Sequence, residues 1–412
     1  MQHRAGRRAL GGGILLALLA AIQGGAATDD VAQTATLLKP AGPTNAVTVV
    51  VTARKWQEPL QAVPGAVTVL PQNTLDDAGI RTVRDAARYV PNLTLGDFTA
   101  RRLNFPFVRG VGSGRNSPAV TTCIDGVPQL SYATANQELL DVDRIEFLRG
   151  AQGSLYGRNT LGGVVNIVPR LPPAEPTADL SLSGGNFNLF DARASAGGPL
   201  GAGGALADLG AGYAVRDGYT RNTITGNRLD SRDAFFGRAQ VLWPAAGPWS
   251  FRLSVGGERD RDGDYALGDL AAVRAQPHEV AHDFEGRTDR DLAQPVFTAT
   301  RQGAQADFTS VTAFQWWRSH DLTDLDTSAA DLIRRDNAEE QQAWIEELRW
   351  SSPTGAPVRV GEHADARWLM GAFGFRSAYR QRAFNEYRPD AAALLGIPFS
   401  YRQYDDADLS DS

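Results

Sequence analysis

Apolar and polar side chains alternate along most of the second half of the chain. From Ala178 onward, segments of about ten residues place apolar side chains at every second position, with Gly-, Asp-, Asn- and Arg-rich loops between them. A period of two indicates β-strands, and this length with aromatic residues near the ends is typical of strands that cross a bilayer. Strands of a soluble β-sandwich also alternate. We predict nine or ten strands, the clearest at Leu209–Val215, Phe235–Trp243, Trp249–Val255, Phe308–Trp317, Trp344–Trp350 and Leu369–Phe375.

The N-terminal residues indicate the compartment. Arg4, Arg7 and Arg8 precede the 13-residue apolar run Leu10–Ile22, and small residues follow it. This order is that of a secretory signal peptide, which we place at residues 1–27; a short anchor or a buried helix is the alternative. The run is shorter than the roughly 20 residues that span a bilayer as a helix. We therefore expect an exported protein that enters a membrane, if at all, without helices.

Composition excludes several classes of protein. The 412 residues carry a net charge of −6, and the arginines are scattered among equally frequent acidic residues, so we expect no nucleic-acid partner. Cys123 is the single cysteine, which excludes an internal disulfide and a Cys₂ or Cys₄ metal site. We expect no cofactor.

The first half of the chain divides into a linker and an α+β domain. Residues 28–46 are polar and rich in Ala, Thr and Pro, which predicts a flexible linker. Residues 47–170 mix short strands with a helix, whereas residues 171–412 hold the alternating strands. The domain opens with the β-branched run Val47–Ala53. That run fits either the first strand of the domain or an unpaired edge to which a partner adds a strand.

Local signals within the domain are specific. Thr82 and Asp85 have the spacing of a capping box at the start of a helix, and Pro91 ends that helix. Val120–Ile124, followed by Asp125-Gly126, predicts a strand that enters a two-residue hairpin turn.

Four motifs follow one another between Val47 and Val168. After the β-branched run come Phe107-Val108-Arg109-Gly110-Val111-Gly112, then Cys123-Ile124-Asp125-Gly126-Val127-Pro128, then Leu140–Gly150 running into Gln152–Val168. In order and spacing they resemble the plug-domain signatures of the TonB-dependent outer-membrane receptors. One departure is Cys123, which stands where an aromatic residue is common in that family.

The resemblance implies a fold and a function. The expected fold is an α+β plug domain followed by all-β antiparallel transmembrane barrel strands. The expected function is active import of a scarce ligand, here a ferric siderophore, across the outer membrane of a Gram-negative cell. Its partners would be the protein TonB with its proton-motive-force-driven inner-membrane complex, the small chelate and outer-membrane lipid. The fold alone does not choose between siderophores, vitamin B12, haem and other ligands.

The resemblance also implies site residues. Arg109 and Arg149, which end the two Arg-Gly signatures, would pair with barrel carboxylates and hold the plug. Loop residues Phe98, Arg101, Arg102 and Tyr132 would contact the ligand. The β-branched run would be the TonB-binding box, which comprises Val47, Thr48, Val49, Val50, Val51, Thr52 and Ala53.

Two motifs suggest metal chemistry instead. His278-Glu279-Val280-Ala281-His282 fits H-E-x-x-H, in which two histidines one helical turn apart bind zinc, and it supports the alternative of a secreted zinc metallopeptidase. Pro277 precedes the first histidine and no third ligand follows, so we interpret the motif as part of a loop. Asp260-x-Asp262-Gly263-Asp264 lacks the EF-hand spacing, and we interpret it as a solvated loop.

Length conflicts with a complete receptor. Residues 171–412 supply about ten strands, whereas the family's barrel has 22, and a barrel of eight to ten strands holds little beyond its own side chains. An unclosed barrel leaves strand edges unpaired in lipid. We therefore expect a barrel that is incomplete and a chain that is C-terminally truncated. A non-transporting receptor remnant is the remaining alternative.

Overall fold

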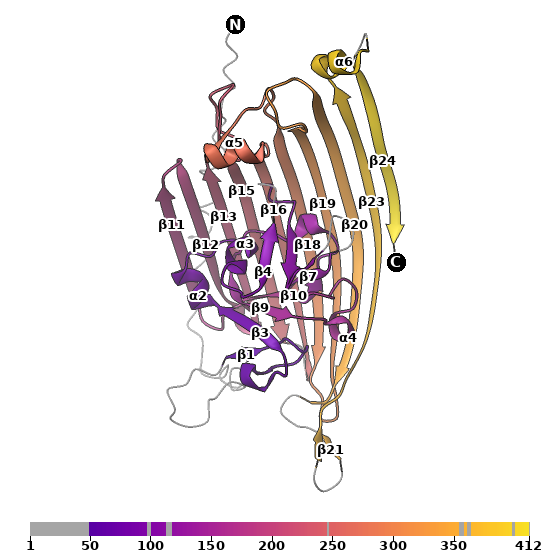
Figure 1. Cartoon of the computed structure of the whole chain (residues 1–412). Helices are drawn as coiled ribbons and strands as arrows, with labels where there is room; N and C mark the ends of the chain where they lie inside the picture. Colours follow the sequence, from indigo (N-terminus) through magenta and orange to yellow (C-terminus); the bar gives the residue numbers. More distant parts are fainter. Residues whose placement is uncertain are drawn as a thin grey trace.

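The computed structural model describes residues 49–96, 100–112, 118–244, 247–353, 358–360, 364–397 and 400–411. The predicted signal peptide and linker lie outside these ranges. The described chain forms a small α+β domain, residues 49–169, that lies against one face of a ten-stranded antiparallel sheet (Figure 1).

The α+β domain is built on a five-stranded sheet in the order β3-β9-β10-β7-β8, with a three-stranded sheet β4-β5-β6 beside it. Only β10 and β7 pair in parallel in the larger of these two sheets. The strands are β1 (Val50–Val51), β2 (Glu58–Pro59), β3 (Ala66–Pro71), β4 (Leu93–Gly96), β5 (Phe105–Val108), β6 (Val111–Gly112), β7 (Val120–Ile124), β8 (Val127–Pro128), β9 (Val142–Arg149) and β10 (Gly163–Pro169). The helices are η3 (Leu60–Ala62), α2 (Gln72–Asp77), α3 (Val83–Ala87), η4 (Tyr132–Thr134) and α4 (Gly153–Tyr156).

Local sequence signals account for several of these elements. Both bonds of the predicted capping box form, because Thr82 Oγ1 accepts from the Asp85 amide and the Asp85 carboxylate accepts from the Thr82 amide. Asp125 and Gly126 have φ of 58° and 79°, the left-handed geometry of a type I′ hairpin turn between β7 and β8. Buried side chains of α3 pack with those of β9 and β10 to form the main core.

The large sheet has the order β11-β12-β13-β15-β16-β18-β19-β20-β23-β24. The six strand segments that we named after Ala178 all lie in this sheet. Its strands are β11 (Thr177–Gly185), β12 (Leu189–Leu200), β13 (Ala205–Arg216), β15 (Arg232–Pro244), β16 (Trp249–Gly263), β18 (Arg287–Arg301), β19 (Asp307–Asp324), β20 (Ile333–Ser351), β23 (Leu369–Tyr387) and β24 (Tyr401–Asp411). The connections contain η5 (Gly201–Gly203), β14 (Arg221–Asn222), α5 (Leu270–Ala275), β17 (Glu279–Val280), β21 (Val358–Val360), β22 (Ala364–Ala366) and α6 (Pro389–Leu395).

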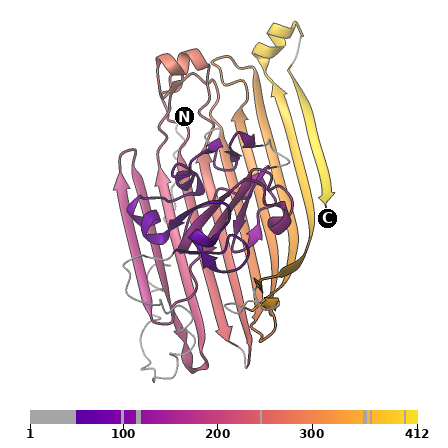
Figure 2. The same ribbon diagram turned by 60° about the horizontal axis from the view of Figure 1, so that its bottom comes forward.

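The two faces of this sheet differ in polarity. In β16, Leu253 and Val255 are 41% and 44% exposed on the outer face, whereas Ser254 and Glu258 are 4% and 6% exposed beneath the α+β domain. Figure 2 shows the domain lying across that inner face. An apolar outer face and a polar inner face are typical of strands in a transmembrane barrel. None of the helices in the described ranges has the length and apolar character of a membrane span.

The antiparallel order sends the connections to two ends. Residues 217–231, 264–286 and 325–332 connect strands at one end, which we call the loop end, together with α6. Turns 201–204 and 302–306 lie at the opposite end. Figure 1 shows α5 and α6 at the top and the β21 hairpin at the bottom.

Candidate functional site

The first described segment is packed into the α+β domain. Val51 and Ala53 are both 0% exposed and share a core with Cys123, Leu148 and Tyr156. Val50–Val51 pair with Glu58–Pro59 in a two-stranded sheet, so one edge of β1 is paired within the described domain. Of the predicted TonB-binding residues, Val47 and Thr48 lie outside the described ranges, and the TonB-binding role stays a prediction.

A buried carboxylate fixes this segment. Glu146 is 0% exposed and accepts from the Thr52 amide at 2.7 Å, Asn166 Nδ2 at 3.0 Å and Arg144 Nε at 2.8 Å. We call Thr52, Arg144, Glu146 and Asn166 the Glu146 cluster. Its bonds join β1 to β9 and β10, so releasing the segment requires breaking hydrogen bonds to a buried charge, which are stronger than neutral ones.

Arg101 joins the α+β domain to the large sheet. Its guanidinium donates to Glu138 of its own domain and, at 3.2 Å, to Asp262 of β16. Glu258 and Asp260 of β16 lie 3.7 and 3.6 Å from it. Burial acts to lower the pKa of Arg101, but these carboxylates outweigh it and raise the pKa well above its ordinary value. The side chain therefore remains charged.

Arg102 makes a second contact between the two parts. It pairs with Asp321 of β19 and with Glu339 of β20, the latter at 3.2 Å. Tyr132 accepts from Arg102 at 3.3 Å and donates to Glu339 at 3.4 Å. Two adjacent arginines thus bind separate groups of inner-face carboxylates.

The structure places Arg101, Arg102 and Tyr132, which we predicted to contact the ligand, at the contact between the domain and the sheet. All three are buried between the domain and the sheet, because the inner face supplies carboxylates that solvated loops would not. Phe98 lies outside the described ranges. A ligand role for these four residues stays untested.

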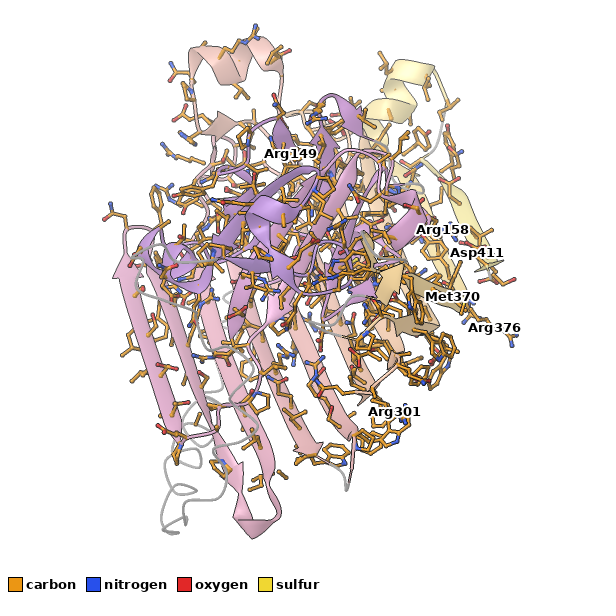
Figure 3. All side chains as sticks on the ribbon, turned by 90° about the horizontal axis from the view of Figure 1, so that it is seen from below. Arg149, Arg158, Arg301, Met370, Arg376 and Asp411 are labelled. Atoms are coloured by element: carbon orange, nitrogen blue, oxygen red, sulfur yellow. The ribbon has the colours of Figure 1, made fainter. Side chains whose placement is uncertain are left out.

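Further charge contacts lie along the same interface. Asp125, at the β7–β8 turn, accepts from Arg238 at 3.3 Å, from Arg252 and from Ser254 at 2.7 Å. Burial opposes ionisation of Asp125, but the two arginines and Ser254 outweigh it and lower its pKa. Lys55 pairs with Glu347 at 3.2 Å. Arg158 pairs with Asp411 of β24 at 2.6 Å, as seen from below in Figure 3.

The plug–barrel pairs predicted for Arg109 and Arg149 are not made with the described strands. Arg149 donates to the carbonyl of Pro91 at 3.2 Å, within its own domain (Figure 3). Arg109 is exposed, with φ of 53°, and makes no ion pair with a described carboxylate. The Arg-Gly signatures led us to predict Arg109 and Arg149 as the residues that hold the plug. The ion pairs with the large sheet are instead made by other residues of the domain, among them Arg101, Arg102 and Asp125. For Asp125, the sequence predicted only a hairpin turn and not its ion pairs with the sheet.

A small cavity lies between the domain and the sheet. Its volume is about 80 Å³, and Asp125, Glu138, Arg238, Glu258 and Gln294 are among its lining residues. This volume has room for a few water molecules, whereas drug-sized ligands occupy pockets of about 300–1,000 Å³. The described contacts must therefore rearrange before such a ligand passes between these two parts.

The two motifs that suggested metal chemistry have other structures. Glu279 and Val280 form strand β17 and His278 has φ of 67°, so the H-E-x-x-H motif is not helical and lacks zinc-peptidase geometry. The interpretation of the 260–264 motif as a solvated loop was wrong, because residues 260–263 lie in β16 and Asp264 is buried. Asp260 and Asp262 lie in β16, buried and paired with Arg290 and Arg101.

Comparisons with known proteins agree with this architecture. Residues 59–164 match the model of the TonB-dependent receptor plug domain. The pesticin receptor of Yersinia pestis is 33% identical over 220 residues, which cover 52% of this chain and 32% of that receptor. The ferripyoverdine receptor of Pseudomonas aeruginosa is 27% identical over 143 residues, which cover 33% of this chain and 17% of that receptor. Residues 59–164 are therefore similar to the plug domain of the TonB-dependent receptors.

The fold match extends beyond the plug. The solved ferric yersiniabactin uptake receptor FyuA of Yersinia pestis superposes with a TM-score of 0.66 at 19% identity, covering 84% of this chain and 61% of that one. The α+β domain and the large sheet therefore have the folds of a plug domain and of part of a transmembrane barrel, which confirms the predicted fold class. The matched segment spans about a third of the length of the pesticin receptor.

Proposed function

We propose that this chain forms the plug and part of the barrel wall of an outer-membrane importer, and that the imported ligand is a ferric siderophore. The observation that carries the proposal is the interface itself, where a plug is held on the polar inner face of a sheet with an apolar outer face. Separate ion pairs can be broken one at a time, which suits a gate that opens and closes.

Import requires a closed barrel. Within the described residues, β11 and β24 each pair on one side only. Lipid does not tolerate open sheet edges, so we propose that further strands join β11 to β24 in the importing protein. Ten strands with open edges would be a non-transporting remnant. The loop end then faces outward and captures the ligand.

Opening the path requires work from outside the receptor, which we assign to TonB and its proton-driven inner-membrane complex. The β-branched segment at Val47–Ala53 is the proposed point of attachment. Its described part, Val49–Ala53, is held by the Glu146 cluster. This cluster includes residues of β9 and β10 in the five-stranded plug sheet. A pull on this segment is therefore transmitted directly to the plug core.

The names of several similar receptors support the siderophore proposal, while vitamin B12 transporters are also among the relatives. Pesticin, ferripyoverdine and ferric yersiniabactin appear in the names of the similar receptors. The alternative of a zinc peptidase is not supported, because Glu279 lies in strand β17 and not in a helix.

Equilibrium binding tests the ligand class. The purified protein in detergent is titrated with ferric yersiniabactin, ferric pyoverdine, cobalamin and haem, and the quenching of tryptophan fluorescence is measured. We expect one ferric siderophore to bind at least about tenfold more tightly than its iron-free form and than cobalamin or haem. Preference for cobalamin or haem would refute the siderophore assignment and leave the fold unaffected.

A further inference from the structure

The outer face of the large sheet changes character toward the loop end. Along β16, the outward side chains are first the exposed Leu253 and Val255 and then Arg259 and Arg261. All four share one face, because side chains of a strand return to the same face at every second position. β16 runs toward the loop that begins at residue 264, so the apolar band of the outer face gives way to a charged band at that end.

The charged band continues on the next two strands. In the sheet register, Arg259 lies opposite Asp291 of β18, and Asp291 lies opposite Arg318 of β19. Arg287, at the start of β18, is four positions from Asp291 and lies on the same face. The arginine group, as we call it, comprises Arg259, Arg261, Arg287 and Arg318.

The central carboxylate of this band is shared by two arginines. Asp291 Oδ1 accepts from Arg261 at 2.8 Å, and its Oδ2 accepts from Arg318 at 2.9 Å. Both oxygens are thus engaged by arginines other than Arg259, which lies directly opposite. Arg259 is exposed and makes no ion pair with a described carboxylate.

The other carboxylates of the band are also engaged. Asp289 accepts from Arg287 at 3.1 Å, and Asp233 of β15 accepts from the Tyr213 hydroxyl at 3.4 Å. In this band, the outer faces of β15, β16, β18 and β19 carry four arginines and three aspartates. One positive charge is therefore left without a carboxylate on these strands, and the geometry places it at Arg259.

Aromatic side chains accompany the arginine group. Phe235 of β15 is exposed opposite Arg259, and the Arg318 guanidinium lies 5.6 Å from the ring centroid of Trp316. The Trp316 indole donates to Glu340 of β20 at 3.1 Å. Aromatic residues with polar partners beside an apolar band are typical of the membrane–water interface. The arginines therefore lie at the level of lipid headgroups, in the outward-facing leaflet if the loop end faces outward as proposed.

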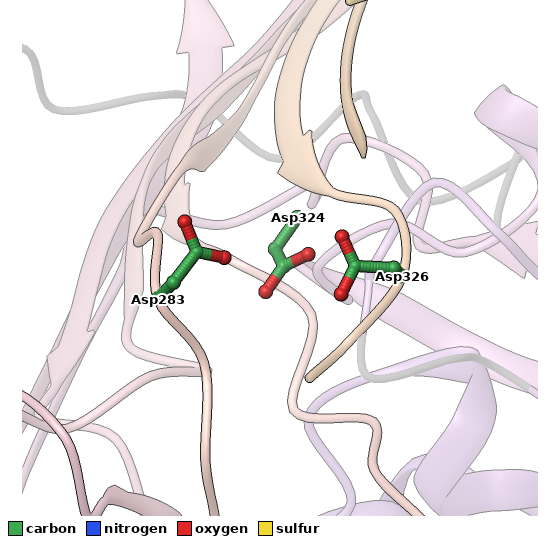
Figure 4. Close-up of side chains that lie close together, drawn as sticks. All are labelled: Asp283, Asp324 and Asp326. Carbon is green, nitrogen blue, oxygen red and sulfur yellow. The ribbon is translucent and has the colours of Figure 1, made fainter. Parts of the chain in front are cut away.

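The loops at the same end contain a group of opposite charge. One carboxylate oxygen from each of Asp283, Asp324 and Asp326 lies within 4.8 Å of the other two (Figure 4). Arg334 pairs with Asp283 at 2.9 Å. Three carboxylates with one arginine repel an anion, so an anion near the loop end is favoured at the outward arginines and not at these loop residues.

We propose that the arginine group binds phosphate groups of lipids in the outward-facing leaflet, with Arg259 as the main contact. Guanidinium groups form paired hydrogen bonds with phosphate oxygens, and Arg259 is the member of the group without a described carboxylate partner. Each guanidinium has five N–H donors, so Arg318 can contact a phosphate while it holds Asp291. The proposal rests on the proposed place of the barrel in the outer membrane, and not on the identity of the imported ligand.

Lipid binding tests the proposal independently of transport. The protein in dodecyl maltoside is titrated with lipid A that carries two phosphates and with the same glycolipid after both phosphates are removed, and bound lipid is measured by native mass spectrometry. We expect the phosphorylated lipid to bind at least about tenfold more tightly, and its affinity to fall at least about tenfold in the double variant Arg259→Gln/Arg318→Gln. Arg380→Gln is the matched control, because the exposed Arg380 of β23 lies opposite Glu340 and pairs with Asp408 at 3.1 Å. It should bind the lipid as the unsubstituted protein does.

Three results would overturn the proposal: equal binding of the two glycolipids, unchanged affinity in Arg259→Gln/Arg318→Gln, or an equal loss in Arg380→Gln. Inorganic phosphate at the concentration of the lipid should not displace it, and displacement would assign the group to free phosphate instead. Siderophore binding is measured on the same variants and should not change. A protein that binds lipid in this way but no siderophore would contradict the proposed function and leave the lipid site intact.

Discussion

At the scale of single residues, the plug is held by arginines whose partners are distant in sequence. Arg101 and Asp262 are separated by 161 positions, and Arg102 and Glu339 by 237. The sequence does not show which distant segments lie side by side. It therefore could not predict the ion pairs that Arg101 and Arg102 make with carboxylates of the large sheet. The turn at Asp125-Gly126 was predictable because its geometry depends on adjacent residues alone.

Replacing Arg101 with Met should destabilise the protein by about 3–5 kcal/mol, because buried carboxylates lose their partner. The measurement is urea unfolding in detergent. Arg318→Met is the matched control, since the exposed Arg318 pairs with Asp291 at the surface and should cost about 0–1 kcal/mol. Equal losses in the two variants would contradict the assigned role of Arg101.

The contribution of Asp125 should depend on pH. Its pKa in the folded protein is lowered from an ordinary value of about 3.9, so its ionised form stabilises the fold above that value. The stabilisation is lost as pH falls through the lower folded pKa. The difference in unfolding free energy between the protein and Asp125→Asn should therefore be larger at pH 7 than near pH 3. A difference independent of pH would show that the carboxylate charge is not involved.

At the scale of elements, periodicity and local signals predicted the capped helix α3, the β7–β8 hairpin and the alternating strands of the large sheet. They could not place β1, because a β-branched run fits both an edge strand and a core strand. The structure buries Val51 and Ala53 through contacts with residues about 100 positions away.

Weakening the Glu146 cluster should loosen the first strand without unfolding the plug. Glu146→Gln removes the charge that accepts from Thr52, Asn166 and Arg144. We expect faster amide hydrogen exchange at Thr52, with little change in the β10 amides. In the control Asp76→Asn, an exposed carboxylate on α2 is neutralised and exchange at Thr52 should not change. Unchanged exchange in Glu146→Gln would show that the core, and not the cluster, holds β1.

At the scale of the whole molecule, the plug lies on the polar face of a sheet whose outer face is apolar (Figure 2). The alternation of apolar and polar side chains predicted a sheet with one apolar and one polar face. The position of the plug depends on many contacts between segments that are distant in the sequence. It could therefore be seen only in the structure.

The most direct test of the account is uptake of ⁵⁵Fe-labelled siderophore by iron-starved cells that carry the receptor with a closed barrel. We predict uptake that requires TonB and is lost on deletion of residues 47–51, while ligand binding is retained. A deletion of equal length at residues 34–38 serves as the control and should leave uptake intact. Uptake that continues without TonB, or that is unaffected by loss of residues 47–51, would contradict the proposal of an importer opened through its N-terminal segment.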